Sequence, residues 1–202
     1  FAINVAGLKT VIDAALSRGL RRVVYLSSAN VYARSTESIS ESDPIAPESY
    51  YAHTKRMAEL LLEAYGSAVE CCVLRVFTVY GGGQRGMLVA RLLGSVERGE
   101  PLRLDPAGDL LLSPVYVDDV CTAVRRILDS PPKPGWRVFN VGGPEMLSIE
   151  GLATVVGTLF GRSPVFEKAS PATALPVGWA ASTEKMRLEL GWAPQENFPS
   201  GL

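Results

Sequence analysis

The chain has 202 residues, a formal net charge of −1, and a composition of 47% hydrophobic and 20% charged residues. This balance is typical of a globular protein with a sizeable core, and it excludes a disordered or collagen-like chain. The near-neutral charge argues against nucleic-acid binding, which usually requires a basic excess. No apolar stretch reaches the length of a membrane span, so we expect no membrane association.

Three cysteines do not form a disulfide framework. Cys71 and Cys72 are adjacent inside an apolar run, and Cys121 lies in a helical pattern. We interpret all three as small buried hydrophobic residues of a protein in a reducing compartment, which predicts a cytoplasmic location. Residues 1–4 have no basic region and no cleavage-like site, so we expect no signal peptide.

The first half of the sequence alternates between helical and strand patterns. Hydrophobic spacing predicts helices over 2–19 and about 49–65. Continuous apolar runs predict strands, each buried on both faces, at 23–26 and 71–77. Residues 33–48 are rich in Ser, Glu, Asp and Pro and are predicted to form a surface loop. The side chains expected on the inward face of the second helix are Met57, Leu60, Leu61 and Ala64.

The second half continues the alternation with shorter elements. Helices are predicted over 87–98, over 117–128, after the capping residue Ser148, and over 182–190. Strands are predicted at 102–104, 110–115 and 137–141. A glycine-rich turn at 81–83 is interpreted as a flexible connection rather than a phosphate cradle, because no helix-opening Gly-Lys-Ser follows it.

Helices alternating with continuous apolar strands predict a parallel α/β sheet with helices on both faces. Ligands of such sheets bind at the carboxyl ends of the strands. The residues that follow the strands are therefore candidates for a functional site, namely 27–28, 78–81 and 140–143.

Tyr51 and Lys55 stand four residues apart at the start of a predicted helix, which places both side chains on one helix face. A phenol is a poor base at neutral pH, with an unperturbed pKa of about 10, but a nearby ammonium favours its ionised form. The pair can act as a general acid and base on an alcohol or carbonyl, with Ser28 bound to the reacting oxygen. The competing interpretation is a half-buried aromatic ring beside a solvated amine, and the spacing alone does not separate the two.

Seven short motifs occur in order along essentially the whole chain. They are Asn4-Val5-Ala6-Gly7, Ser27-Ser28-Ala29-Asn30-Val31-Tyr32, Tyr51-x-x-x-Lys55, Arg75-x-x-Thr78-Val79-Tyr80-Gly81, Val115-Tyr116-Val117-Asp118-Asp119, Phe139-Asn140-Val141-Gly142-Gly143 and Leu190-Gly191-Trp192-x-Pro194. In this order they resemble the extended short-chain dehydrogenase/reductases of the NAD-dependent epimerase/dehydratase family. The resemblance implies that Tyr51 is the catalytic acid and base, that Lys55 holds the nicotinamide ribose, and that Ser28 positions the substrate oxygen.

The same resemblance implies NAD or NADP as the cofactor. Besides Tyr51 and Lys55, it places Ser27 and Phe77 on the cofactor side, with Phe77 acting through its backbone. Phe77 is explained equally well as a core aromatic at a strand end. Thr78 and the 81–85 loop, which includes Arg85, are expected to face the substrate.

Two features depart from the family pattern. The family begins with a strand and a Gly-x-x-Gly-x-x-Gly turn that places the cofactor pyrophosphate at a helix N-terminus, and this sequence has no such turn. We therefore expect the 202-residue chain alone not to bind NAD tightly. Leu112-Ser113-Pro114 stands where the family often has Arg-Asp-Phe, and leucine cannot donate a hydrogen bond to a phosphate.

The predicted fold is α/β, a Rossmann-like doubly wound parallel sheet with a small C-terminal α/β substrate domain. Residues 1–80 and 113–143 are assigned to a partial NAD(P)-binding domain, and residues 81–112 and 144–202 to the substrate domain. The family resemblance also implies a homodimer in which the helix carrying Tyr51 packs against its copy.

The predicted function is that of an NAD(P)-dependent epimerase or oxidoreductase acting on a secondary alcohol or carbonyl of a sugar or nucleotide sugar. A reductase of the dihydroflavonol type would use the same site and release a different product. The alternative from another class is a non-catalytic nucleotide-binding or regulatory member of the same fold. No Cys, His and Asp cluster has the spacing of a metal site, and Asp118-Asp119 is interpreted as a charge pair at a helix start.

Overall fold

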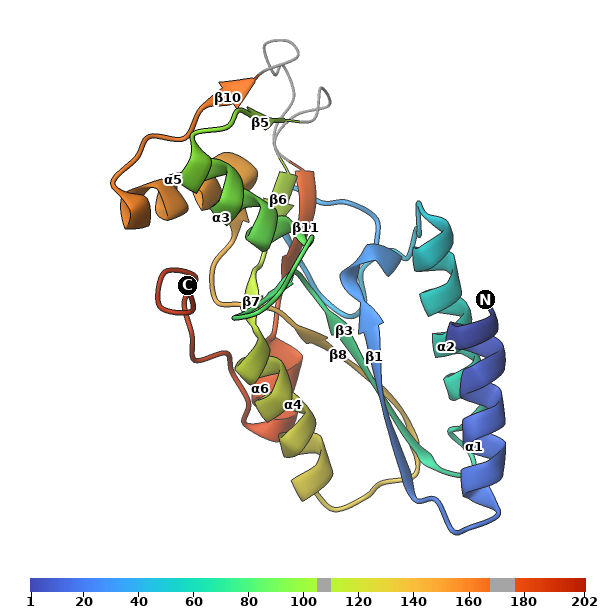
Figure 1. Cartoon of the computed structure of the whole chain (residues 1–202). Coiled ribbons are helices and arrows are strands. Elements are labelled where there is room, and N and C mark those ends of the chain that lie inside the picture. The colour runs from blue at the N-terminus through green and yellow to red at the C-terminus, as the bar shows by residue number, and fades with distance from the viewer. Residues whose placement is uncertain (105–109, 168–176) are drawn as a thin grey trace.

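The computed structural model describes residues 1–104, 110–167 and 177–202 (Figure 1). Its helical segments are η1 (Ala2–Gly7), α1 (Leu8–Leu16), η2 (Ala29–Val31), α2 (Tyr50–Tyr65), α3 (Leu88–Arg98), α4 (Val117–Asp129), α5 (Ile149–Phe160) and α6 (Glu184–Leu190). Its strands are β1 (Arg22–Ser28), β2 (Ser38–Ile39), β3 (Glu70–Val76), β4 (Val79–Tyr80), β5 (Leu102–Arg103), β6 (Leu110–Leu112), β7 (Val115–Tyr116), β8 (Gly135–Val141), β9 (Leu147–Ser148), β10 (Phe166–Glu167) and β11 (Val177–Ala181). None of the described helices has the length and apolar character needed to cross a bilayer.

The central sheet contains three parallel strands in the order β1-β3-β8. Their register aligns Ser28, Val76 and Val141, so the three carboxyl ends meet at one edge of the sheet. Every residue of the middle strand β3 is buried. Helices α1 and α2 lie on one face of the sheet and α4 and α6 on the other (Figure 1). The predicted parallel α/β arrangement, with helices on both faces, is confirmed.

Three predictions about individual elements are wrong. Strand β1 is not buried on both faces, because it is the outer strand of this sheet within the described part of the chain, and Leu26 is 45% exposed. The strand expected at 110–115 is divided into β6 and β7 by Ser113 and Pro114, since proline has no backbone N–H for a sheet hydrogen bond. Cys121 is exposed on α4, whereas Cys71 and Cys72 are buried as expected.

Helix α2 buries a different face from the predicted one. Met57 and Leu60 are exposed, whereas Ala58, Glu59 and Leu62 are fully buried. The prediction considered apolar spacing alone. The helix is instead turned so that the Glu59 carboxylate lies in the interior, where hydrogen bonds satisfy it.

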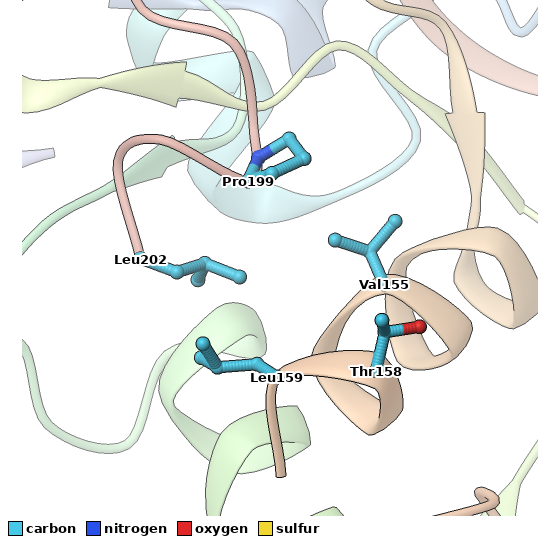
Figure 2. Close-up of a pocket in the computed structure, with 5 residues that line it drawn as sticks. All are labelled: Val155, Thr158, Leu159, Pro199 and Leu202. Atoms are coloured by element: carbon cyan, nitrogen blue, oxygen red, sulfur yellow. The ribbon is translucent and has the colours of Figure 1, made fainter. Parts of the chain in front are cut away.

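A second layer of structure lies beyond the carboxyl edge of the central sheet. It contains the sheet β2-β11-β6-β9 and the pair β5-β10, and α3 and α5 pack together over an apolar core. A pocket of about 310 Å³ opens between α5 and the C-terminal segment (Figure 2). It is lined by Val155, Thr158, Leu159, Pro199 and Leu202. Residues 105–109 and 168–176 of the expected substrate domain lie outside the described residues, and the division into two domains stays a prediction.

The C-terminal segment is attached to α4 through Asp119. Both Asp118 and Asp119 lie in the first turn of α4, as expected, but Asp119 is buried. Its carboxylate accepts hydrogen bonds from the backbone N–H groups of Gln195, at 3.0 Å, and Glu196, also at 3.0 Å. Asp119 therefore holds the segment that follows α6 against the start of α4.

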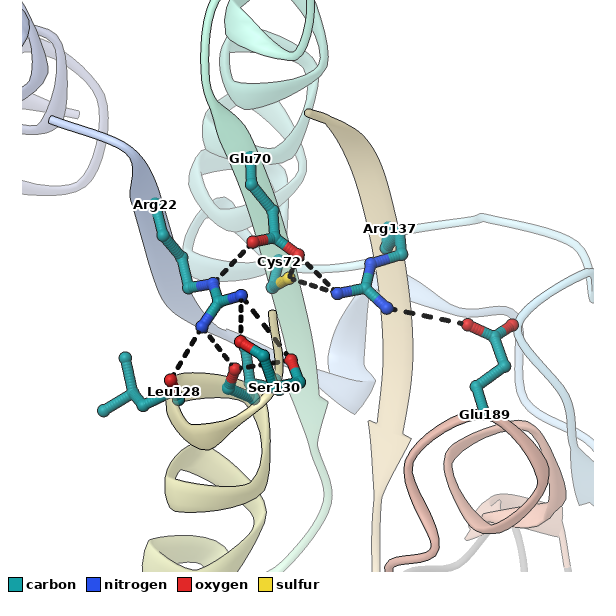
Figure 3. A network of polar contacts seen from close by, with 8 residues as sticks. Arg22, Glu70, Cys72, Leu128, Ser130, Arg137 and Glu189 are labelled. Atoms are coloured by element: carbon teal, nitrogen blue, oxygen red, sulfur yellow. Dashed lines mark hydrogen bonds and ion pairs between the residues drawn. The ribbon is translucent and has the colours of Figure 1, made fainter. Parts of the chain in front are cut away.

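A buried ion cluster lies at the amino end of the central sheet (Figure 3). The guanidinium of Arg22 donates to Glu70 at 2.5 Å, and Arg137 donates to the other oxygen of the same carboxylate. Arg22 also donates to the carbonyl oxygens of Ile127 and Leu128, at 2.5 and 2.9 Å. These carbonyls belong to the last turn of α4, where Ile127 also accepts a hydrogen bond from the Ser130 hydroxyl at 2.8 Å. One arginine thus connects β1, β3 and the C-terminus of α4.

Candidate active site

Helix α2 begins beside the carboxyl end of β1. Ser49 caps it, with its side-chain oxygen accepting a hydrogen bond from the Ala52 backbone N–H at 3.1 Å. Tyr51 and Lys55 therefore occupy successive turns of one helix face. The side chain of Tyr51 is 48% exposed. The structure brings together the two residues on which the predicted chemistry depends.

Lys55 reaches from α2 to the backbone of β1. Its ammonium donates to the carbonyl oxygen of Leu26 at 2.7 Å. The same nitrogen lies 5.8 Å from the ring centroid of Tyr51 and 4.7 Å from that of Tyr25. Burial lowers the pKa of Lys55 below its ordinary value, and the negative charge of Glu59 acts in the opposite direction.

The two serines at the end of β1 point to different surroundings, because successive strand residues face opposite sides. Ser28 is partly exposed, and its oxygen accepts a hydrogen bond from the Asn30 backbone N–H at 3.2 Å. Ser28 keeps its own hydroxyl proton for a further bond. Ser27 is buried and donates its hydroxyl proton to Glu59 at 2.6 Å. The role of Ser27 toward a cofactor stays a prediction, and its hydroxyl is already engaged.

The other predicted site residues follow β3. Phe77 is buried, its ring lies 6.4 Å from that of Tyr32, and its backbone N–H donates to Val141 at 2.9 Å. The carbonyl of Thr78 accepts a hydrogen bond from the Val115 N–H at 2.8 Å. Arg85 is exposed in the loop that leads to α3. The roles predicted for these residues toward cofactor and substrate remain predictions.

Glu59 lies at the centre of a buried polar network that the sequence interpretation missed. It stands four residues after Lys55, on the same face of α2. Besides the bond from Ser27, its carboxylate accepts two bonds from Arg75, at 3.0 and 2.8 Å, and one from Arg56 at 3.0 Å. The available signal was a third polar residue at helical spacing after Tyr51 and Lys55, because a carboxylate on a helix face that packs against a sheet needs an interior partner.

The network continues across the sheet from Arg75. This guanidinium donates to the phenol oxygen of Tyr32 at 2.8 Å, and Tyr32 donates in turn to the side-chain oxygen of Asn140 at 2.8 Å. The amide of Asn140 donates to the carbonyl of Ile39, also at 2.8 Å. Buried hydrogen bonds thus connect α2, β3, β8 and β2 just below the carboxyl edge.

The donors at this edge fit one end of a dinucleotide. Lys55 has three N–H donors and uses one on Leu26, Tyr51 is about half exposed, and Ser28 keeps a proton to donate. Such donors at the carboxyl ends of parallel strands suit ribose hydroxyls and a reacting oxygen. The pyrophosphate end has no matching Gly-x-x-Gly-x-x-Gly turn in the sequence. Donors of this kind fit the ribose of a dinucleotide.

Comparison with known proteins gives consistent matches. The sequence model of the NAD dependent epimerase/dehydratase family matches residues 1–142. UDP-glucuronate 4-epimerase of Thermodesulfobacterium geofontis is 27% identical over 205 residues, covering 98% of this chain and 62% of that protein. The structure of MoeE5 in complex with UDP-glucuronic acid and NAD is 29% identical with a TM-score of 0.86, covering 98% of this chain and 68% of that one. UDP-glucuronic acid 4-epimerase from Bacillus cereus, in complex with UDP-glucuronic acid and NAD, is 25% identical with a TM-score of 0.86, over 98% of this chain and 64% of that one.

The chain matches only part of the length of each of these relatives. The chain spans between 62% and 65% of the length of three of the curated relatives that it matches. The match nevertheless covers almost all of the present chain, including β1, α2 and the loop after β3.

Proposed function

The chain belongs to the NAD-dependent epimerase/dehydratase family, and from this premise we propose that it carries the acid–base site of an NAD(P)-dependent epimerase or oxidoreductase. The proposed substrate is a secondary alcohol or carbonyl of a nucleotide sugar. The observation that carries the proposal is the Tyr51–Lys55 pair on one face of α2, tied to the carboxyl end of β1. Two relatives support this proposal. One is named as a UDP-glucuronate 4-epimerase, and the other, MoeE5, binds UDP-glucuronic acid and NAD in its structure.

In the proposed mechanism Tyr51 moves the proton of the substrate oxygen. Its phenolate takes the proton when the alcohol is oxidised, and the resulting phenol returns that proton when the carbonyl is reduced. The Lys55 ammonium favours the ionised phenol through its charge, and its remaining donors hold ribose hydroxyls. Ser28 donates a hydrogen bond to the same substrate oxygen. When bound, the dinucleotide supplies the hydride acceptor and donor.

The substrate side of the site is proposed to lie in the segment after β3. Leu112, which stands where the family often has arginine, is buried and offers no charge to a diphosphate. Arg85 is an exposed guanidinium in the neighbouring loop, and this group suits phosphate recognition. We assign Arg85 to the diphosphate and Thr78 to the sugar.

Assembly and location are also proposed. Besides Tyr51, helix α2 exposes three large hydrophobic side chains along its length, namely Tyr50, Met57 and Leu60. Such a face is suited to packing against a second copy of the same helix, which supports the expected homodimer. All three cysteines are free thiols, which supports a reducing compartment such as the cytoplasm.

The proposal is tested by comparing two neighbouring tyrosines in the full-length protein that carries this chain. Tyr51→Phe removes the proposed acid and base, whereas Tyr50→Phe alters a 74% exposed tyrosine outside the proposed chemistry. With NAD and a panel of UDP-sugars, product analysis by chromatography should show that Tyr51→Phe loses about 10²–10⁴-fold in turnover and that Tyr50→Phe retains it. Retained turnover in folded Tyr51→Phe contradicts the mechanism.

A further inference from the structure

Tyr25 of β1 faces the same side of the sheet as α2. Because side chains alternate along a strand, Tyr25 and Ser27 point toward α2, and Leu26 points away. The ring of Tyr25 lies beneath the ammonium of Lys55, with 4.7 Å between the nitrogen and the ring centroid. The buried Tyr25 hydroxyl oxygen has no hydrogen-bond partner among the described residues. Tyr25 therefore contacts Lys55 through its ring and not through its hydroxyl.

The residue after Tyr25 supplies the second contact to Lys55. The Leu26 carbonyl oxygen accepts a hydrogen bond from the ammonium at 2.7 Å. A lysine side chain has four flexible carbons, and fixing it in one place has an entropic cost that its contacts must offset. Two consecutive residues of β1 thus contact one ammonium, one through a ring face and one through a carbonyl.

The surroundings of Lys55 disfavour its charged form, so contacts that stabilise the ammonium matter. Burial lowers the pKa of Lys55, and the nearby carboxylate on α2 is that of Glu59. That carboxylate already binds Arg75 of β3 and Arg56 of α2, so its negative charge is shared with two guanidinium groups. Burial also raises the pKa of Tyr25 to about 12, with Tyr51 and Glu59 adding to the rise. At neutral pH the Tyr25 ring is therefore uncharged and offers its face to a cation.

We propose that Tyr25 is a positioning residue, whose ring face forms with the Leu26 carbonyl a socket that holds the Lys55 ammonium charged and next to Tyr51. The inference rests on the proposed function, because that function gives the position of Lys55 its chemical meaning. Tyr25 acts through Lys55 and does not touch the reacting atoms. The attraction of a cation to an aromatic face grows as the two groups lose water, and Tyr25 and Lys55 are both partly buried.

The test uses the full-length protein labelled with ¹³C- and ¹⁵N-lysine. The side-chain NMR signals of Lys55 are assigned by their loss in Lys55→Arg. Tyr25→Phe removes the unpartnered hydroxyl and keeps the ring, and Tyr25→Leu removes the ring. In the wild type and in Tyr25→Phe, the Lys55 signals should show the upfield shift that a ring face causes. In Tyr25→Leu this shift should fall to what the more distant Tyr51 ring causes, and Lys55 should deprotonate at lower pH.

Two results overturn the socket. One is a Tyr25→Leu protein in which the upfield shift and the titration of Lys55 are unchanged, and the other is a Tyr25→Phe protein that behaves like Tyr25→Leu. Backbone amide spectra check that each variant is folded, and Tyr25→Met replaces Tyr25→Leu if the smaller side chain prevents folding. These spectra need no substrate or cofactor. Turnover that survives Tyr51→Phe therefore refutes the proposed function separately from the contact between Tyr25 and Lys55.

Discussion

Removing one partner of the buried Glu59–Arg75 ion pair should destabilise the protein more than removing both. The Glu59 side chain is fully buried and that of Arg75 is 3% exposed, and two hydrogen bonds of 3.0 and 2.8 Å join them. A buried pair that loses one partner leaves an uncompensated charge, which costs about 3–5 kcal/mol. Replacing both partners with apolar residues of similar volume is often neutral or stabilising.

The structure predicts different losses of stability for the two single variants. Arg75→Met leaves Glu59 with bonds from Ser27 and Arg56, so its cost should lie near about 3 kcal/mol. Glu59→Leu leaves Arg75 with the phenol of Tyr32, which burial keeps neutral at pH 7 by raising its pKa to about 12. Its cost should therefore lie near about 5 kcal/mol.

Urea unfolding followed by circular dichroism at low temperature measures these costs. The double variant should lose less than either single variant, and therefore less than their sum by about 2 kcal/mol or more. Additive losses, or single variants that each lose less than about 1 kcal/mol, refute the argument that this pair is held by mutual charge compensation. If the slope of the unfolding free energy against urea concentration changes in a variant, its unfolded or native state has changed and its free energy cannot be compared with that of the wild type.

Three further predictions concern groups away from Tyr51. Burial opposes the ionisation of Glu70, but hydrogen bonds from its two arginines outweigh burial and hold its pKa below 4.5. The ionised Glu70 carboxylate therefore stabilises the folded protein above that pH, and this contribution is lost as the pH falls through the lowered pKa. Urea titrations at a series of acidic pH values should show that Glu70→Gln lacks this pH dependence. Asp119→Ala should lower the free energy of unfolding by about 1–3 kcal/mol, because the backbone N–H groups of Gln195 and Glu196 lose a buried acceptor. The same variant should speed proteolytic cleavage of the C-terminal segment. Burial raises the pKa values of Cys71 and Cys72 to about 11, whereas Cys121 is exposed. Mass spectrometry of the native protein treated with iodoacetamide at pH 8 should therefore show Cys121 modified before the other two cysteines, and unfolding in urea should remove the difference.

The order of long elements and the helix that carries Tyr51 could be predicted because their signals are local. Apolar runs indicated the cores of β1, β3 and β8, and Ser49 caps α2 where a helix start was expected. The spacing of Tyr51 and Lys55 fixed their shared face before any tertiary contact was known. The prediction failed at Ser113 and Pro114, which divide the expected strand into β6 and β7.

The rest depends on contacts between distant segments. Strands of two or three residues, such as β2 and β9, exist only because a neighbour provides hydrogen bonds. The burial of Glu59 requires Arg75, which is 16 residues away in another element. Tyr25 looked like an ordinary apolar strand residue, and its contact with Lys55 follows from the packing of α2 on β1. No spacing rule within one element reveals such pairs.

The buried ion cluster and the candidate site lie at opposite ends of the same strands. Arg22 and Ser28 occupy the two ends of β1, six residue steps or about 20 Å apart. The loops at the carboxyl edge can therefore accumulate substitutions while the salt bridges that anchor α4 stay intact. This spatial separation gives the chain room to evolve or to be engineered at its candidate site, and it directs any search for thermostabilising substitutions to the Arg22 end of the sheet.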